Sequence, residues 1–588
     1  MNIIEIFRKS CYIIGLNECS INMSNRVIRK FSYSDIVSFS NETEGESQRG
    51  GKTYKIGFLR SYSIEVMEPI IKGLTVFEQY KLDRKYSNFN NILQDSFELE
   101  KIFPRELDLL IVVWRKADIG NSDSELLKYV ETTLRNISSY MEKHSSVRVL
   151  VHSFTAEEAV NESDNIIKKF CESNANASLL DMEEVNSMMP GVNIYSESME
   201  RIAKYPLTKE ATILIAKRYI SIMRVVFGFQ KKCLSIDLDN TVWEGILGED
   251  GEESVYDSLN SGTDFNKLWE YLASLLKGGV ILCINSKNNE NDVKQLFENR
   301  KMTLGWDDFI VKKINWLPKS HNIQTMAKEL NIGADSIVHL DDSEFECEEI
   351  LAGAPETTVV YSGDGPRESV RLLTEGGYFD ILTHTADDSL RAQSYRSEQK
   401  RERVKSSYPD INSFIRSLSL NLTVFEVREN DLDRISQLYL KTNQFNMTTI
   451  RYTKGELKKF SSASDKLLYG YSLEDKFGKY GIIGSYLIDV SESEWRIDSF
   501  LMSCRAIGRK VEYELINKIV TDTSEGGVSK LIATYEKTPK NGFLEKFYDE
   551  LGFERIKEAD NSVTYELNCS EYRKVNEGMI KIRERNDG

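Results

Sequence analysis

Short apolar runs alternate with amphipathic segments along most of the chain. Runs rich in branched side chains predict strands at residues 54–59, 107–114, 147–151, 233–236, 279–284, 336–340 and 357–361. The segments between them carry apolar residues at helical spacing, as at residues 266–277. This alternation is typical of parallel sheets covered by helices, so it predicts two α/β domains, the second of them doubly wound.

The pattern changes beyond residue 385. A charged helical stretch is predicted at residues 389–405, and mixed helices and strands follow, with strands near residues 422–427, 480–490 and 495–502. A chain of 588 residues is too long for one hydrophobic core. We therefore expect an N-terminal extension and linker (1–52), an α/β domain with connecting helices (53–228), a second α/β domain (229–385), a helical linker (386–420), an α+β domain (421–570) and a tail (571–588).

Composition and charge exclude several classes of function. The formal net charge is −16, and the acidic residues are spread along the chain, which argues against a nucleic-acid partner. No apolar run approaches the roughly 18 residues of a membrane helix, and the N-terminus lacks a signal-peptide pattern. The eight cysteines are scattered without any C-x-x-C pair, as in reduced proteins. We expect a cytoplasmic protein without a membrane partner.

The segment 237–241, Asp-Leu-Asp-Asn-Thr, carries the strongest chemical signal. Asp237 and Asp239 follow a predicted strand, which places both at the carboxyl edge of a parallel sheet, where open α/β folds bind ligands. Asp237 is the candidate nucleophile toward phosphorus, and Asp239 is the candidate general acid and base. Taken alone, the pattern also fits an acidic turn after a strand.

Three downstream segments supply the groups that phosphoryl transfer needs. Ser286 ends a predicted strand and can donate to a phosphoryl oxygen, while Lys319 opens a predicted helix and can neutralise a phosphoaspartate. Asp341 and Asp342 end another strand and offer oxygen ligands of the kind that Mg²⁺ prefers. The expected magnesium ligands are Asp237, Asp239, Asp341 and Asp342.

In this order, the four motifs resemble those of the haloacid dehalogenase superfamily. About 45 residues separate Thr241 from Ser286, and much of that interval is predicted helix, so no large cap domain fits there. An uncapped site stays open to a phosphoryl group presented by another protein or domain. This favours a carrier-bound or macromolecular substrate.

A more specific resemblance rests on residues 237–245 (DLDNTVWEG), 286–289 (SKNN), 314–320 (INWLPKS), 442–446 (TNQFN) and 503–509 (SCRAIGR). In these motifs the chain resembles the FkbH-like proteins, subfamily IIIC of that superfamily. It departs from them at Asn285 and at Ser343-Glu344. The resemblance implies an SGNH-hydrolase-like N-terminal domain, a phosphatase domain and a GNAT-like C-terminal domain. It also implies removal of phosphate from D-1,3-bisphosphoglycerate and transfer of the glyceryl group to the phosphopantetheine thiol of an acyl carrier protein.

The third domain contains a partial R-x-x-G-x-G/A loop, formed by Arg505, Gly508 and Arg509, in which Lys510 replaces the last glycine. In acetyltransferases such a loop holds the pyrophosphate of coenzyme A through backbone amides. Cys504 is a candidate acyl acceptor; the alternative is an inert, half-buried thiol. The expected substrate-binding or pantetheine-binding residues are Thr241, Asn288, Asn443, Arg505, Gly508, Arg509 and Asn541.

The N-terminal domain offers weaker evidence of chemistry. Ser61 or Ser63 follows a predicted strand, as the nucleophile of an esterase would. The domain's only histidines, His144 and His152, are not in a D-x-x-H setting. A structural or carrier-docking role is therefore expected rather than hydrolysis.

The sequence thus predicts a magnesium-dependent phosphatase and acyltransferase. It would act on a small acyl phosphate and load an acyl carrier protein in polyketide-type biosynthesis, as the resemblance implies. One alternative is a free-standing phosphatase of a small metabolite, with the third domain as a scaffold. Another is a non-enzymatic carrier-docking factor, against which the intact Asp237, Asp239, Lys319 and Asp341 argue.

Overall fold

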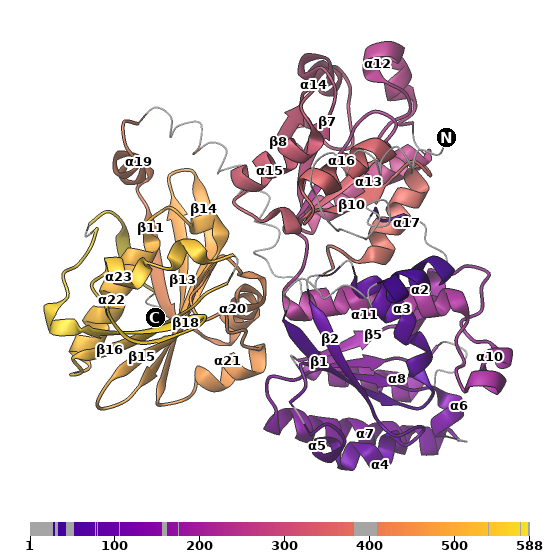
Figure 1. Cartoon of the computed structure of the whole chain (residues 1–588), viewed down its shortest axis with the longest axis horizontal. Coiled ribbons are helices and arrows are strands. Elements are labelled where there is room, and N and C mark those ends of the chain that lie inside the picture. Colours follow the sequence, from indigo (N-terminus) through magenta and orange to yellow (C-terminus); the bar gives the residue numbers. More distant parts are fainter. Residues whose placement is uncertain are drawn as a thin grey trace.

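The computed structural model describes residues 27–29, 33–42, 52–155, 161–380, 401 and 408–585, apart from residues 77, 79, 105, 121, 175, 261, 539 and 577. It contains three sheets, each packed against its own helices (Figure 1). The predicted multidomain α/β fold class is confirmed. None of the described helices is long and apolar enough to cross a membrane. The predicted helix at residues 389–405 lies outside the described residues, except for residue 401.

The first sheet is parallel and has helices on both faces. In β3, Leu109, Ile111 and Val113 pack into the core on one face, whereas Leu110 and Val112 pack into the core on the other. Its strands, in spatial order, are β2 (Lys81–Tyr86), β1 (Thr53–Arg60), β3 (Leu109–Val113), β4 (Arg148–His152) and β5 (Ala177–Leu180). Its helices are α2 (Tyr33–Glu42), α3 (Glu68–Thr75), α4 (Ile92–Phe97), α5 (Leu99–Ile102), α6 (Lys116–Ile119), α7 (Asp123–Lys143), α8 (Asn161–Ser173), α9 (Met182–Ser187), α10 (Glu197–Ala203) and α11 (Lys209–Phe227).

The second sheet is also parallel, with β6 at its centre. Alternate residues of β6 again face opposite cores, with Leu234 on one side and Cys233 on the other. Its strands, in spatial order, are β10 (Thr358–Tyr361), β9 (Ile337–Asp341), β6 (Cys233–Ile236), β7 (Ile281–Ser286) and β8 (Phe309–Ile314). Its helices are α12 (Leu247–Asp257), α13 (Asp264–Lys277), α14 (Glu290–Asn299), α15 (Lys319–Glu329), α16 (Glu344–Gly353) and α17 (Pro366–Gly376).

The third sheet is largely antiparallel and lies beside the other two domains (Figure 1). Its strands are β17 (Glu554–Ala559), β18 (Ser562–Asn568), β16 (Lys530–Glu536), β15 (Trp495–Met502), β14 (Gly478–Val490), β13 (Lys466–Asp475), β11 (Asn421–Glu426) and β19 (Lys581–Glu584) in spatial order, with β12 (Phe445–Asn446) paired to β15. Its helices are α19 (Ile411–Leu418), α20 (Glu429–Lys441), α21 (Lys454–Phe460), α22 (Val511–Glu525) and α23 (Phe547–Glu550). The parallel strands β15 and β16 pair over three residues and then diverge.

Part of the predicted N-terminal extension belongs to the packed structure. Ile28 forms a parallel bridge with Val360 of β10, and Ile36 of α2 is buried in the core of the first domain. Helix α11 joins the first two domains, and Arg224 on it forms a buried ion pair of 2.8 Å with Glu78. The chain before residue 52 therefore contacts both α/β domains.

Candidate phosphatase site

The carboxyl ends of β6 and β9 bring three acidic side chains together. Oxygen atoms of Asp237, Asp341 and Asp342 lie within 4.8 Å of one another, and Asp341 is fully buried. Three closely spaced carboxylates are hard oxygen donors, and this set fits Mg²⁺. The carboxylate of Asp239 is not in this group.

Lys319 compensates part of this negative charge. Its Nζ lies 2.8 Å from Asp237 Oδ1 and 2.6 Å from Asp341 Oδ2, and it also forms an ion pair with Glu346. Lys319 is the first residue of α15, as predicted, and its backbone carbonyl accepts a hydrogen bond of 3.1 Å from Asn285 Nδ2. Asn285 is a position at which the chain departs from the family that it resembles. Its side chain thus helps to hold Lys319 in place.

The pKa values of the three carboxyl groups are shifted by burial and by the charges beside them. Burial raises the pKa of Asp237 to about 7, with Lys319 opposing the shift and Asp341 adding to it. Burial also disfavours ionisation of Asp341, but the hydrogen bond from His339 and the charge of Lys319 hold its pKa below the ordinary value. Burial and the charge of Asp341 raise the pKa of Asp342. A bound divalent cation would favour the ionised form of all three carboxyl groups.

Asp239 is held separately by three donors. Its Oδ1 accepts hydrogen bonds from Trp243 Nε1 at 2.9 Å and from the Leu247 amide at 3.1 Å. Its Oδ2 accepts from Asn288 Nδ2 at 2.9 Å, so Asn288 orients this carboxyl group. Burial raises its pKa, which favours a carboxyl group that can give up a proton during the reaction.

The segment after Asp239 turns back tightly. Asn240 adopts a left-handed conformation with φ of 55°, and its side chain accepts a hydrogen bond of 3.0 Å from the Gly245 amide. Gly245 has φ of 88°, and a Cβ atom there would lie 2.5 Å from Asp250 Oδ2, so glycine is required. Thr241 Oγ1 donates to Asp342 Oδ1 at 3.1 Å. The turn therefore links the segment 237–241 to Asp342.

Two residues near the site had no role predicted from the sequence. Glu346 forms ion pairs with Lys319 and, at 2.8 Å, with Lys287. The Ser343 amide donates to Asp341 Oδ1 at 3.0 Å, and its side chain caps the start of α16. A serine with an acidic residue three positions later is a helix-start signal, so the sequence contained the cue for α16 but not for the contact with Lys319.

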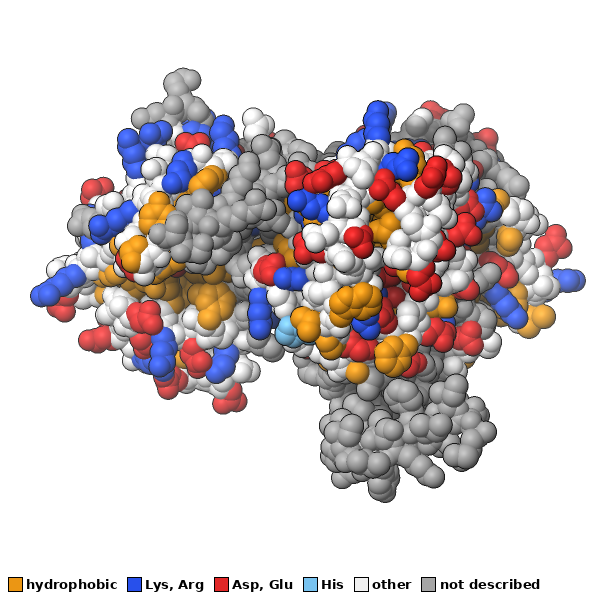
Figure 2. Space-filling view, turned by 90° about the horizontal axis from the view of Figure 1, so that it is seen from above, with side chains coloured by type: hydrophobic (Ala, Val, Ile, Leu, Met, Phe, Trp, Pro, Cys, Tyr) orange, Lys and Arg blue, Asp and Glu red, His pale blue; other side chains and the backbone are white. Residues whose placement is uncertain are grey.

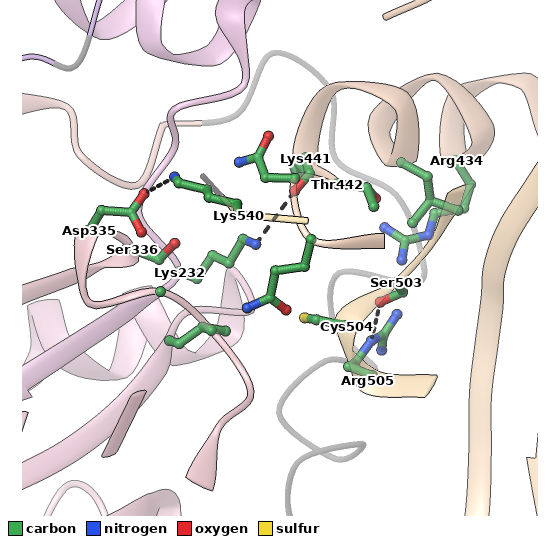
Figure 3. Close-up of a pocket in the computed structure, with 15 residues that line it drawn as sticks. Lys232, Asp335, Ser336, Arg434, Lys441, Thr442, Ser503, Cys504, Arg505 and Lys540 are labelled. Carbon is green, nitrogen blue, oxygen red and sulfur yellow. Dashed lines mark hydrogen bonds and ion pairs between the residues drawn. The ribbon is translucent and has the colours of Figure 1, made fainter. Parts of the chain in front are cut away.

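The predicted residues of the third domain do not all come together. Asn443, Cys504 and Arg505 line one cavity of about 300 Å³ between the second and third domains (Figure 3). The Arg509 guanidinium instead lies 5.8 Å from the centre of the Phe414 ring. Asn541 is fully buried and donates to the carbonyls of Glu536 and Asn446, which ties the end of β16 to β12. Gly508 adopts φ of 79° and is not among the residues that line the cavity.

In the first domain, the candidate serine has an acidic partner. The buried Ser61 hydroxyl donates to Asp118 Oδ2 at 2.8 Å. His152 is buried beside the Tyr219 hydroxyl at 2.7 Å, and burial lowers its pKa to about 3. His144 lies 3.5 Å from Glu100. These contacts do not form a serine–histidine pair.

Comparison with solved structures found a neighbour that resembles this chain in fold. The N-terminal part of the protein BF1531 from Bacteroides fragilis, which contains a phosphatase domain complexed with Mg, matches 60% of this chain and 100% of that chain, at 23% identity and a TM-score of 0.51. This likeness shows the fold. Neighbours of the third domain have lower TM-scores.

Two acetyltransferase structures are among those neighbours. The ribosomal-protein-S18-alanine N-acetyltransferase from Escherichia coli matches at 12% identity and a TM-score of 0.20, over 25% of this chain and 94% of that chain. The PaiA N-acetyltransferase from Thermoplasma acidophilum, in complex with coenzyme A, matches at 15% identity and a TM-score of 0.20. The match covers 25% of this chain and 98% of that chain. No known family model and no curated protein matches the sequence.

Proposed function

We propose that this chain is a magnesium-dependent phosphatase that uses Asp237 as its nucleophile. The observation that carries the proposal is that the acidic groups at this sheet edge fall into two sets. Asp237, Asp341 and Asp342 converge as a cation site with Lys319 beside them, while Asp239 is held apart by neutral donors. Mg²⁺, when bound, supplies the counter-charge that lets a phosphate approach these carboxylates.

The chain's own groups account for both halves of the reaction. Asp237 attacks phosphorus, the bond from phosphorus to the leaving oxygen breaks, and Asp239 gives that oxygen its proton. Water then attacks the phosphoaspartate, Asp239 takes the proton from this water, and the bond from Asp237 to phosphorus breaks to release phosphate. Ser286, which hydrogen bonds to Asp237, and Lys319 stabilise the charge on the phosphoryl oxygens.

We further propose a substrate and an acceptor for this chain. The substrate is a bisphosphoglycerate-like acyl phosphate, and the acyl group passes to the thiol of an acyl carrier protein. Two features support this: the resemblance to FkbH-like proteins in the second and third domains, and the position of Cys504 at a cavity between those domains. Asp237 removes the phosphate ester of this substrate and leaves its acyl phosphate intact. The Cys504 thiolate then attacks the acyl carbon, and inorganic phosphate leaves. The pantetheine thiol finally attacks this thioester, which transfers the acyl group and releases the Cys504 thiolate.

The test is intact-mass spectrometry of a phosphopantetheinylated carrier protein incubated with the enzyme, Mg²⁺ and D-1,3-bisphosphoglycerate. A glyceryl-sized mass gain is expected with the wild type and is lost with Asp237→Asn. Asp307→Asn, an exposed aspartate of the same domain, serves as the matched control and should load normally. Phosphate release without a mass gain would leave the phosphatase proposal standing and overturn carrier loading.

A further inference from the structure

A polar side chain lies inside the apolar core of the phosphatase domain, beside the three carboxylates. His339 is the third residue of β9, is fully buried, and stands two residues before Asp341. Because side chains alternate along a strand, His339 and Asp341 lie on the same face of the sheet. Ile337, on this face as well, packs into a core with Met326 of α15 and Cys347 of α16. An imidazole in such a core needs a partner for each of its nitrogen atoms.

Both ring nitrogens of His339 have a partner. Nε2 lies 2.8 Å from Asp341 Oδ2, and Nδ1 lies 3.1 Å from the hydroxyl of Ser235, which is opposite His339 in the register of β6 and β9. An ionised carboxylate only accepts, so Nε2 carries the hydrogen and donates it to Asp341. Burial lowers the pKa of His339, so the ring is uncharged near pH 8 and Nδ1 accepts from Ser235. Ser235 therefore selects the tautomer that donates to Asp341.

The two oxygen atoms of Asp341 are occupied to different degrees. Oδ2 accepts two hydrogen bonds, from His339 Nε2 and, at 2.6 Å, from Lys319 Nζ. Oδ1 accepts one hydrogen bond from the described residues, donated by the Ser343 amide at 3.0 Å. Each carboxylate oxygen has two lone pairs, so the protein fills Oδ2 and leaves capacity for a further partner on Oδ1. His339 and Lys319 thus decide which oxygen of Asp341 can take a cation.

These charges meet where water does not replace a lost contact. On the face shown in Figure 2, acidic and basic side chains are interspersed at the surface, where solvent screens them. The side chains of Lys319 and Asp341 are instead 1% and 0% exposed. If the hydrogen bond from His339 were removed, Asp341 would have to turn toward another donor or leave part of Oδ2 unsatisfied. Either change would disturb the orientation of this carboxylate.

Packing alone does not explain a histidine at this position. Ile337 on the same face of β9 is apolar, and so is Val359, which lies opposite His339 in the register of β10. An aliphatic side chain would suit this core without needing two polar partners. The imidazole instead links the hydroxyl of Ser235 to the carboxylate of Asp341.

We infer that His339 is a positioning residue that holds Asp341 in the orientation in which it binds the divalent cation, with Ser235 fixing the tautomer. The inference rests on the proposed function for the identity of the cation. Its effect on the reaction passes through Asp341 and, through the shared Oδ2, through Lys319. Losing a group that orients a metal ligand typically lowers metal affinity or activity by about 10- to 100-fold.

The test is binding of Mn²⁺ to the full chain at pH 8 without substrate, followed by the loss of the electron paramagnetic resonance signal of the free ion. Mn²⁺ prefers the same oxygen ligands as Mg²⁺. His339→Leu removes the donor to Asp341 and should weaken binding by about tenfold or more. His339→Gln, whose side-chain amide can still donate, should retain most of the affinity.

Ser235→Ala is a milder second variant, because it removes a single hydroxyl group. It should weaken Mn²⁺ binding by about threefold, as expected for the loss of one neutral hydrogen bond. His321→Leu, which replaces an exposed histidine of α15, is the matched control and should bind Mn²⁺ like the wild type.

A role in packing alone would lower the melting temperature or the number of Mn²⁺ sites per chain, but would leave the Kd of the remaining sites unchanged. An unchanged Kd in both His339→Leu and Ser235→Ala would therefore overturn the role of His339. If His339→Leu does not fold, an unchanged Kd in Ser235→Ala would overturn it. Absence of Mn²⁺ binding by the wild type would instead overturn the cation site of the proposed function, and the role of His339 with it.

Discussion

The two parallel five-stranded sheets of this chain differ in how charge is arranged at their carboxyl edges. At the first sheet, Arg115 pairs with Asp118 at 2.7 Å and with Glu200 at 2.6 Å, and Asp118 also accepts the hydrogen bond from Ser61. The second sheet instead gathers three carboxylates around Lys319, and burial raises the pKa of Asp237 to about 7.

The difference shows that the fold alone does not mark a reactive site. Where acidic and basic groups satisfy one another, as Arg115 does with Asp118 and Glu200, each charged group has a partner within the protein itself. Where like charges are held together, the folded chain retains an electrostatic imbalance that a cation or a substrate can relieve.

Replacing the nucleophile should have the largest effect. Asp237→Asn removes the attacking carboxylate, so phosphate release should fall by at least about 10³-fold. The measurement is Mg²⁺-dependent loss of the phosphate ester from D-1,3-bisphosphoglycerate, followed by mass spectrometry. Retention of more than a tenth of the activity would show that Asp237 is not the nucleophile.

Lys319→Met should lower the same activity by about 10²- to 10³-fold, because it removes the positive charge beside the reacting group. It also leaves the buried carboxylates of Asp237 and Asp341 without their cation, so the melting temperature should fall. Lys328→Met, an exposed lysine of the same helix, is the control and should change neither quantity. Normal activity in Lys319→Met would contradict the assigned role.

Mg²⁺ binding should depend on pH. The pKa of Asp237 is raised to about 7 without metal, so the folded protein holds a proton there that Mg²⁺ must displace. Binding should therefore strengthen as the pH rises through about 7 and weaken below it. Differential scanning fluorimetry should show a larger Mg²⁺-induced rise in melting temperature at pH 8 than at pH 6. An equal rise at both values would place the metal elsewhere.

The first sheet should give the smallest effect. Ser61→Ala removes one buried hydrogen bond to Asp118, which costs about 1 kcal/mol of stability and should leave phosphate release unchanged. Calorimetric melting and the phosphate assay check the two halves of this prediction. An esterase activity of the wild type that Ser61→Ala abolishes would show that the first sheet also holds an active site.

Much of the fold and of the second sheet's site could be predicted because local signals sufficed. The fully buried runs of β3 and β6 identify strands covered on both faces, and an acidic pair directly after a strand fixes its place at the carboxyl edge. The helix start at Lys319 also follows from local sequence. Strand β2, Lys-Leu-Asp-Arg-Lys-Tyr, was missed because an edge strand can carry charged side chains and has no apolar run.

Long-range placement accounts for what the sequence could not predict. Glu346 reaches Lys319 only because α16 packs beside α15. Lys232 and Lys441, which line one cavity between the second and third domains, are 209 residues apart in the sequence. Asp239 was expected to bind metal, but its orientation depends on Trp243, Leu247 and Asn288, which no spacing rule specifies. Side-chain direction at a sheet edge is decided by such tertiary contacts.

Phosphorylation of Asp237 during the reaction can be tested by reductive trapping. The enzyme is incubated with Mg²⁺ and an acyl phosphate, quenched with borohydride, digested and analysed by peptide mass spectrometry. We predict conversion of residue 237 to homoserine, dependent on substrate and on Mg²⁺. Phosphate release at full rate with residue 237 unmodified throughout would contradict the account.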